Sequence, residues 1–154
     1  MPGSFGQEQW LLIALAFFGI IGYIAWIRWR DRRWIDRRFG HEKVLAVSFG
    51  VNYFGRATEP GPPRRSSGFL LLLPDRLVYR SRTARLEVEI PGAGIARVYP
   101  GSSHKGVDLH QSVLKIDYIN TDNQRDCVAF RLPYPPQWAR AIETSLMNKK
   151  PPAT

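Results

Sequence analysis

The strongest constraint in this sequence is an uncharged apolar run near its start. The run extends from Trp10 to Ile27 and reads WLLIALAFFGIIGYIAWI, which is 18 residues without a charged side chain. As a helix it would rise roughly 27 Å, close to the thickness of the hydrocarbon core of a bilayer. A buried helix of a globular domain would normally carry a polar stripe, and this run has none. We therefore predict a transmembrane helix over residues 10–27.

The residues that flank the run favour a retained anchor over a cleaved signal peptide. Glu8 is the one charged side chain before it, whereas a secretory signal begins with a basic segment. No cleavage site of the A-x-A kind follows the run. We expect residues 1–9 to form a short extracytoplasmic N-terminus.

A basic cluster directly follows the run. Six arginines lie within eleven residues, offset by Asp31 and Asp36: Arg28, Arg30, Arg32, Arg33, Arg37 and Arg38. Basic residues beside a span favour the cytoplasmic side, so we predict a single-pass protein of the cytoplasmic (inner) membrane with its N-terminus outside. Residues 28–41 then form a basic juxtamembrane helix or linker that contacts anionic lipid headgroups. At that level lipid already supplies the phosphates, which disfavours a nucleic-acid partner.

Tryptophans lie near both ends of the apolar run, and small residues recur within it. Trp10 at one end, and Trp26, Trp29 and Trp34 at the other, fit the aromatic belts of membrane helices. Small residues recur every three positions inside the span, at Ala16, Gly19, Gly22 and Ala25. Small residues allow a neighbouring helix to approach closely, so they are candidate helix-packing positions. Glycine is also common in membrane helices that have no partner, and both interpretations stay open.

After Gly40 the sequence changes to alternating apolar and polar residues with frequent turn signals, which predicts a mainly-β domain. The seven predicted strands are 44–54, 68–73, 76–81, 85–90, 95–99, 113–119 and 125–132. Side-chain parity predicts two antiparallel hairpins. One places Arg80, Tyr79 and Leu77 opposite Glu87, Val88 and Ile90, with Thr83 and Ala84 as the turn or with a longer turn. The other places Ile116 opposite Val128 and Leu114 opposite Phe130.

A C-terminal helix follows the strands. Proline at 133, 135 and 136 precedes an amphipathic repeat of Trp138, Ile142 and Leu146. Lys149 and Lys150 suit the negative end of the helix dipole, and the prolines after them prevent its continuation. We expect the helix to end there and residues 149–154 to form a tail.

This order of elements resembles the pleckstrin-homology (PH) superfamily, including its GRAM and bacterial PH-like branches. The resemblance is carried by residues 68–98, GFLLLLPDRLVYRSRTARLEVEIPGAGIARV, which look like the run of apolar strand, turn, Arg-Leu, hairpin, Ile-Pro and Ile-x-x-Val of those domains. It covers about residues 42–148. It implies a strongly bent antiparallel sheet or barrel of about seven strands, with the C-terminal helix plugging one open end.

The sequence offers little chemistry for catalysis or metal binding. Its single cysteine, Cys127, falls on a predicted strand without a nearby histidine in sequence, so we expect an inert thiol. His104, Asp108 and His110 lie in a predicted Gly/Ser-rich loop, where solvent-exposed polar residues explain them as well as a metal would. We expect neither an enzyme nor a cofactor.

The loop from Arg56 to Ser67 is the best candidate ligand site. PH domains that bind phosphoinositides use basic residues on this loop and its flanking strands, and the resemblance implies that role for Arg56, Arg64 and Arg65. The following strand, residues 69–73, carries no basic residue of the kind that continues the family's motif. The alternative interpretation is a proline-rich basic loop that faces solvent or anionic lipid.

Two functions follow from these observations. The first is a non-enzymatic structural or interaction subunit of a membrane protein complex, with other membrane protein subunits as partners. Its plan resembles the H subunit of photosynthetic reaction centres, so an energy-transducing assembly, photosynthetic or respiratory, is conceivable. The second is a module that binds or senses anionic phospholipid.

Overall fold

The chain divides into two compact units, residues 1–41 and 42–154. The computed structural model describes residues 6–148. Residues 1–5 of the predicted N-terminal segment 1–9, and the whole predicted tail 149–154, therefore lie outside the described residues. The same holds for Lys149 and Lys150, which were expected at the end of the C-terminal helix.

The described residues of the first unit contain one helix, α1 (Gln7–Phe39), which is continuous from the apolar run through the arginine cluster. Its most apolar 18-residue window has a mean hydropathy of 2.3, so by length and composition α1 could span a membrane. The predicted juxtamembrane segment is helical up to Phe39. Arg37 and Arg38 lie in the last turn, where positive charge interacts favourably with the helix dipole.

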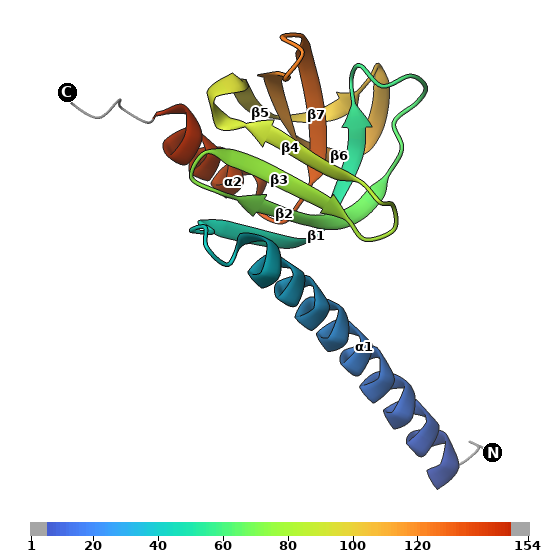
Figure 1. The fold of residues 1–154 in the computed structure, drawn as a ribbon. Coiled ribbons are helices and arrows are strands. Elements are labelled where there is room, and N and C mark those ends of the chain that lie inside the picture. The colour runs from blue at the N-terminus through green and yellow to red at the C-terminus, as the bar shows by residue number, and fades with distance from the viewer. Residues whose placement is uncertain (1–5, 149–154) are drawn as a thin grey trace. The chain divides into compact units, whose positions relative to one another are not determined.

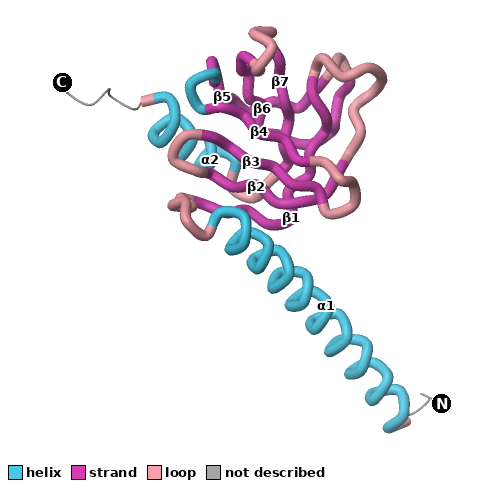
Figure 2. Tube along the Cα trace, in the orientation of Figure 1, coloured by secondary structure: helices cyan, strands magenta, loops and turns pink. Residues whose placement is uncertain are grey.

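The second unit is a seven-stranded antiparallel sheet followed by a helix (Figures 1 and 2). The strands are β1 (Ala46–Arg56), β2 (Ser66–Leu72), β3 (Arg76–Ser81), β4 (Glu87–Pro91), β5 (Ile95–His104), β6 (Val107–Ile119) and β7 (Arg125–Arg131). Their order in the sheet is β4-β3-β2-β1-β7-β6-β5, so β1 is central and pairs with both β2 and β7. The predicted fold class is confirmed.

Both predicted hairpin registers are confirmed. Leu77, Tyr79 and Arg80 of β3 lie opposite Ile90, Val88 and Glu87 of β4. Ile116 of β6 lies opposite Val128 of β7, and Leu114 lies opposite Phe130. The turn between β3 and β4 is the longer alternative, residues 82–86, so Arg82 and Arg85 do not face each other in the ladder.

The hydrophobic core lies on the inner face of the bent sheet. Three aromatic rings from three different strands meet there: Tyr53 lies 5.0 Å from Tyr79 and 5.4 Å from Phe130, and Tyr79 lies 5.6 Å from Phe130, centroid to centroid. All three side chains are buried. Aromatic pairs at such separations contribute beyond the apolar area that they bury.

The hairpin of β5 and β6 is longer than the sequence predicted. We expected strands 95–99 and 113–119 with a polar loop between them, whereas the strands extend to His104 and from Val107. Lys105 and Gly106 form a two-residue turn with φ of 54° and 74°, as in a type I′ hairpin. Residues 109–112 bulge opposite Ser102, and Leu109 packs against a small second cluster of Phe54, Val113 and Ala129.

The C-terminal helix α2 (Pro135–Ile142) begins at a proline and continues as a π-helical turn, η2 (Glu143–Met147). Trp138 is half-buried, and Ile142 and Leu146 are buried against the inner core. A 3-10 turn, η1 (Gly92–Gly94), connects β4 to β5 and lies beside η2. The predicted amphipathic face is therefore the face that covers the core.

Truncation of the core-facing side of α2 should destabilise the domain. Ile142 is fully buried, so we expect Ile142→Ala to lower the free energy of unfolding by about 2–5 kcal/mol through lost apolar burial and a residual cavity. Arg140→Ala, on the exposed side of the same helix, is the control and should change it by less than about 0.5 kcal/mol. Chemical unfolding of the full chain in detergent, followed by circular dichroism, measures both. Equal effects would contradict the packing role of α2.

Candidate functional site

Two loops that carry arginines leave the same end of the hairpin formed by β2 and β3. The β1–β2 loop, residues 57–65, enters β2 at Ser66, and the β3–β4 loop, residues 82–86, leaves β3 at Ser81. Gly68 pairs with Ser81 in the ladder, which brings the start of β2 and the end of β3 together. The two loops therefore lie at the same end of the sheet (Figure 1). Arg64 and Arg65 on one loop and Arg82 and Arg85 on the other are at that end.

Hydroxyl groups connect these two loops. The Ser66 Oγ donates to the Ser81 Oγ at 2.7 Å, and the Tyr79 hydroxyl donates to the Ser66 carbonyl oxygen at 2.9 Å. The Ser81 Oγ in turn accepts the backbone N–H groups of Thr83 and Ala84, at 3.2 and 3.0 Å. Burial raises the pKa of the Tyr79 hydroxyl, which keeps it protonated as a donor. Both loops are thus tied to one polar network.

The arginines of the loop pair present positive charge to solvent. Arg64, Arg65 and Arg85 are exposed, and none of them forms an ion pair with any residue of the described range 6–148. A backbone hydrogen bond of 2.8 Å from the Arg82 N–H to the Ser67 carbonyl holds the β3–β4 loop against β2. The β3–β4 loop surrounds a recess of about 420 Å³ that Arg82, Thr83 and Arg85 help to line. We call Arg64, Arg65, Arg82 and Arg85 the loop-arginine cluster.

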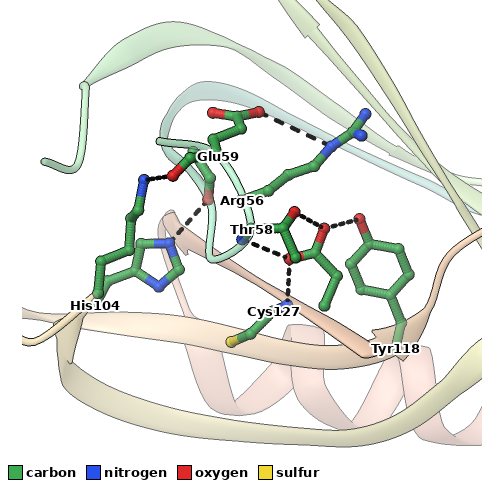
Figure 3. Close-up of polar contacts among 9 residues, drawn as sticks. Arg56, Thr58, Glu59, His104, Tyr118 and Cys127 are labelled. Atoms are coloured by element: carbon green, nitrogen blue, oxygen red, sulfur yellow. Dashed lines mark hydrogen bonds and ion pairs between the residues drawn. The ribbon is translucent and has the colours of Figure 1, made fainter. Parts of the chain in front are cut away.

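Arg56, the third predicted phosphate-binding residue, has a different position. It ends β1, and its Nε lies 3.9 Å from the Glu59 carboxylate in the first turn of the loop (Figure 3). The side chain thus interacts at the base of the β1–β2 loop, while Arg64 and Arg65 lie at the other end of the loop, immediately before β2. The sequence grouped these three arginines and missed Arg82 and Arg85. The antiparallel order of β2 and β3 was the signal that could have found them.

A buried carboxylate fixes the start of the β1–β2 loop (Figure 3). Asp126 on β7 is 5% exposed, and its Oδ2 accepts the Thr58 hydroxyl at 2.8 Å while its Oδ1 accepts the Thr58 N–H at 3.3 Å. The Cys127 N–H also donates to this carboxylate, at 2.8 Å, and so does the Tyr118 hydroxyl, at 3.5 Å. Burial, together with the charge of Asp126, raises the pKa of Tyr118 to about 12, so its hydroxyl stays protonated.

His104, which the sequence placed in an exposed loop, is buried beside the same loop (Figure 3). Its Nε2 lies 2.9 Å from the Gly55 carbonyl oxygen, and a neutral ring that donates from this nitrogen satisfies both groups. The neighbouring Lys105 Nζ donates to the Glu59 carbonyl oxygen. Burial lowers the pKa of His104. The tip of the β5–β6 hairpin is therefore a second support of the β1–β2 loop.

The side chains considered for metal binding and nucleophilic chemistry, His104, His110 and Cys127, lie in different surroundings. No group of three His, Cys, Asp or Glu side chains within residues 6–148 could hold a metal ion. His104 is buried, whereas His110 is exposed and interacts with Asp108 at 3.4 Å. Burial and, to a smaller extent, the nearby Asp117 raise the pKa of the Cys127 thiol to about 12. The thiol is therefore protonated at neutral pH. A recess of about 550 Å³ beside Cys127 also has Asp126 on its wall, whose oxygens are already hydrogen-bonded.

The predicted membrane-facing residues all lie on α1. Ala16, Gly19, Gly22 and Ala25 are exposed, and apart from the adjoining backbone of α1 itself a Cβ built at Gly19 or Gly22 would meet nothing within 4 Å. The six arginines at 28, 30, 32, 33, 37 and 38 are also exposed. Two of them stack on tryptophan rings one turn earlier, with Arg30 5.0 Å from Trp26 and Arg33 4.9 Å from Trp29.

Comparison with known proteins identifies the fold. No protein-family model and no curated protein matches the chain. The C-terminal domain of an unknown protein from Leishmania infantum is 15% identical, with a TM-score of 0.53 over 75% of this chain and 94% of that chain. The N-terminal PH domain of Vps36 is 16% identical, with a TM-score of 0.51 over 70% and 80%. A chain of the 8S snRNP assembly intermediate is 8% identical, with a TM-score of 0.55 over 72% and 87%. These likenesses support a PH-like fold.

The buried histidine should make the stability of the domain depend on pH. Because the pKa of His104 is lower in the folded chain than its ordinary value of 6.5, the unfolded chain binds more protons as the pH falls through that range. We expect the free energy of unfolding to fall as the pH is lowered from about 7 to about 5, and His104→Gln to remove part of that fall. His110→Gln, at an exposed position, is the control and should retain it. Identical pH profiles for wild type and His104→Gln would contradict the buried neutral state.

Proposed function

We propose that this protein is a membrane-anchored, non-enzymatic interaction module that acts as a structural subunit of a membrane protein complex. The observation that carries the proposal is the union of two parts in one chain. One is a helix whose most apolar 18-residue window has a mean hydropathy of 2.3 and which continues without interruption through six arginines, and the other is a PH-like domain. Such domains typically bind other molecules without transforming them. The anchor would hold that binding surface at the membrane.

The distribution of charge along the chain supports one orientation of α1 in the membrane. Basic residues beside a span are retained on the cytoplasmic side, and the six arginines all lie on the domain side of the apolar run. The domain would then lie in the cytoplasm, with the N-terminus across the membrane. In this arrangement α1 contacts partner helices inside the bilayer while the domain contacts cytoplasmic surfaces of the same assembly.

The glycines of α1 support an intramembrane partner. Gly19 and Gly22 leave open space on the helix surface, and within the described chain nothing fills it. Close approach of a second helix at small residues gives van der Waals contact along both backbones, which is what drives association of helices in lipid. A large side chain at these positions should therefore disturb a partner and leave this chain's own fold intact.

Replacement of the two glycines tests the subunit proposal. We expect the tagged full chain, extracted in a mild detergent, to elute as a defined complex with stoichiometric partners. Gly19→Leu with Gly22→Leu should reduce the yield of that complex several-fold, because the added side chains prevent close helix contact. Ile20→Leu with Ile21→Leu is the matched control at adjacent positions. A wild-type chain that elutes alone, or equal yields for the two double variants, would contradict the proposal.

A second candidate function is binding of anionic phospholipid by the loop-arginine cluster. The observation that favours it is that the loop with Arg64 and Arg65 and the loop with Arg82 and Arg85 leave the same end of the sheet, where the Ser66 hydroxyl is hydrogen-bonded to the Ser81 hydroxyl. Guanidinium groups hold phosphates through paired, charge-assisted hydrogen bonds, and convergence from two loops would let several act on one headgroup. This role is compatible with an anchor, because a membrane surface would lie near the domain.

Vesicle binding by residues 42–154, without the anchor, tests the lipid-binding function. We expect salt-sensitive binding to vesicles that contain an anionic phospholipid and none to phosphatidylcholine vesicles. Arg64→Gln with Arg65→Gln should weaken binding about tenfold or more, since each arginine near an anionic surface contributes about 1 kcal/mol. Arg131→Gln with Arg140→Gln removes the same charge from exposed positions elsewhere and is the control. Equal losses would indicate diffuse attraction and exclude the cluster as a site.

A further inference from the structure

The arginines that follow the apolar run are not equivalent around the helix. Trp26, Trp29, Arg30, Arg33 and Arg37 are separated by three or four residues, which places them on one side of α1 at about 100° per residue. We call these five residues the tryptophan–arginine face. Arg28 and Arg32 point to other sides of the helix by the same geometry. The face therefore contains half of the six arginines and two of the interfacial tryptophans.

The side chains of this face are arranged in stacked pairs. The guanidinium carbon of Arg30 lies 5.0 Å from the centre of the Trp26 ring, and that of Arg33 lies 4.9 Å from the Trp29 ring. Contact with an aromatic face restrains a guanidinium but does not consume its hydrogen-bond donors, because the N–H groups project from the edge of the plane. Each arginine is thus oriented and still able to donate two parallel hydrogen bonds.

The face is open and positively charged. Trp26 and Trp29 are 50% and 55% exposed, and Arg30, Arg33 and Arg37 are exposed as well. Within the described part of the chain, these three arginines form no ion pair. Asp31 directly follows Arg30 and Asp36 directly precedes Arg37, and adjacent residues of a helix point about 100° apart, so each of these two carboxylates projects to a different side from its neighbouring arginine. The donors of the face are therefore available to an anion from outside the chain.

The position along the helix identifies the anion. Trp26 lies at the end of the uncharged run, so in a spanning helix the face lies at the boundary between hydrocarbon and headgroups. Tryptophan rings prefer that boundary, and the anions found there are lipid phosphates. We propose that the tryptophan–arginine face is a binding site for one anionic phospholipid, with Trp26 and Trp29 against the glycerol and upper acyl region and Arg30, Arg33 and Arg37 around the phosphate. This inference rests on the proposed membrane anchor.

The site differs from general attraction to an anionic leaflet in one measurable respect. General attraction depends on the number of arginines, whereas a site depends on which arginines are present. Two double variants remove the same charge: Arg30→Gln with Arg33→Gln acts on the face, and Arg28→Gln with Arg32→Gln acts beside it. Both retain four of the six arginines, so both should preserve the charge bias that orients the helix. Trp26→Leu with Trp29→Leu removes the stacking partners while keeping the segment apolar.

The experiment titrates the full chain in detergent with phosphatidylglycerol, and in parallel with phosphatidylcholine, and counts bound lipids by native mass spectrometry. We expect the wild type to retain one phosphatidylglycerol with at least tenfold preference over phosphatidylcholine. Arg30→Gln with Arg33→Gln should weaken that binding about tenfold or more, and the tryptophan pair about threefold. Arg28→Gln with Arg32→Gln should change it less than about twofold.

Equal weakening by the two arginine pairs would overturn the site and leave only diffuse attraction. Unchanged binding in the tryptophan variant would overturn the stacked arrangement and with it the proposed site. Membrane insertion is measured separately, by alkaline extraction of membranes that contain the full chain. A chain that is extracted would overturn both the anchor and this inference, whereas a chain that stays inserted but binds phosphatidylglycerol and phosphatidylcholine equally would overturn only the inference.

Discussion

The bending of β1 is the constraint on which the domain depends. This strand pairs with β2 on one side and β7 on the other, so the first and last strands along the chain are neighbours in the middle of the sheet. Its register is interrupted twice, between Phe49 and Val51 and between Tyr53 and Arg56. Gly50 and Gly55 lie in these interruptions with φ of 71° and 90°, a region that residues with a Cβ rarely adopt. The two bulges curve the strand, so the sheet encloses one core.

The same arrangement limits where a partner can bind the domain. The strands at the two ends of the order, β4 and β5, do not pair with each other, so each leaves an edge. β4 is five residues long and carries Glu87 and Glu89, and β5 contains Pro100 in its middle. Charge, shortness and proline are the features that discourage an added strand. The loops that leave β1 and β3 instead carry exposed arginines, at Arg64, Arg65 and Arg85. Exposed positive charge attracts anionic groups, so these loops are better suited to recognition than the two sheet edges.

The sequence predicted those features that repeat with a fixed period. Alternation within strands defined the register of Tyr79 with Val88 and of Ile116 with Val128, and the four-residue repeat defined the buried face of α2. It did not predict the extended β5–β6 hairpin, because Gly101, Ser102 and Ser103 are typical loop residues and their pairing depends on the tertiary structure. The burial of His104 and the pairing of Arg56 with Glu59 were missed for the same reason. The loop-arginine cluster was half predicted, since Arg82 and Arg85 join it only through the pairing of β2 with β3.

The tryptophan–arginine face of α1 and the loop-arginine cluster differ in how far their arginine side chains are restrained, and this difference affects which anions each can recognise. On α1, Arg30 and Arg33 stack on tryptophan rings, so these two guanidinium groups have already lost part of their conformational entropy before a ligand binds. In the loop-arginine cluster the backbone is fixed through Ser66 and Ser81, while the exposed side chains of Arg64, Arg65 and Arg85 keep their rotational freedom. Restrained arginines favour one phosphate geometry, whereas free ones adapt to many anions. Selectivity should therefore be greater on α1, and sensitivity to salt greater on the loops.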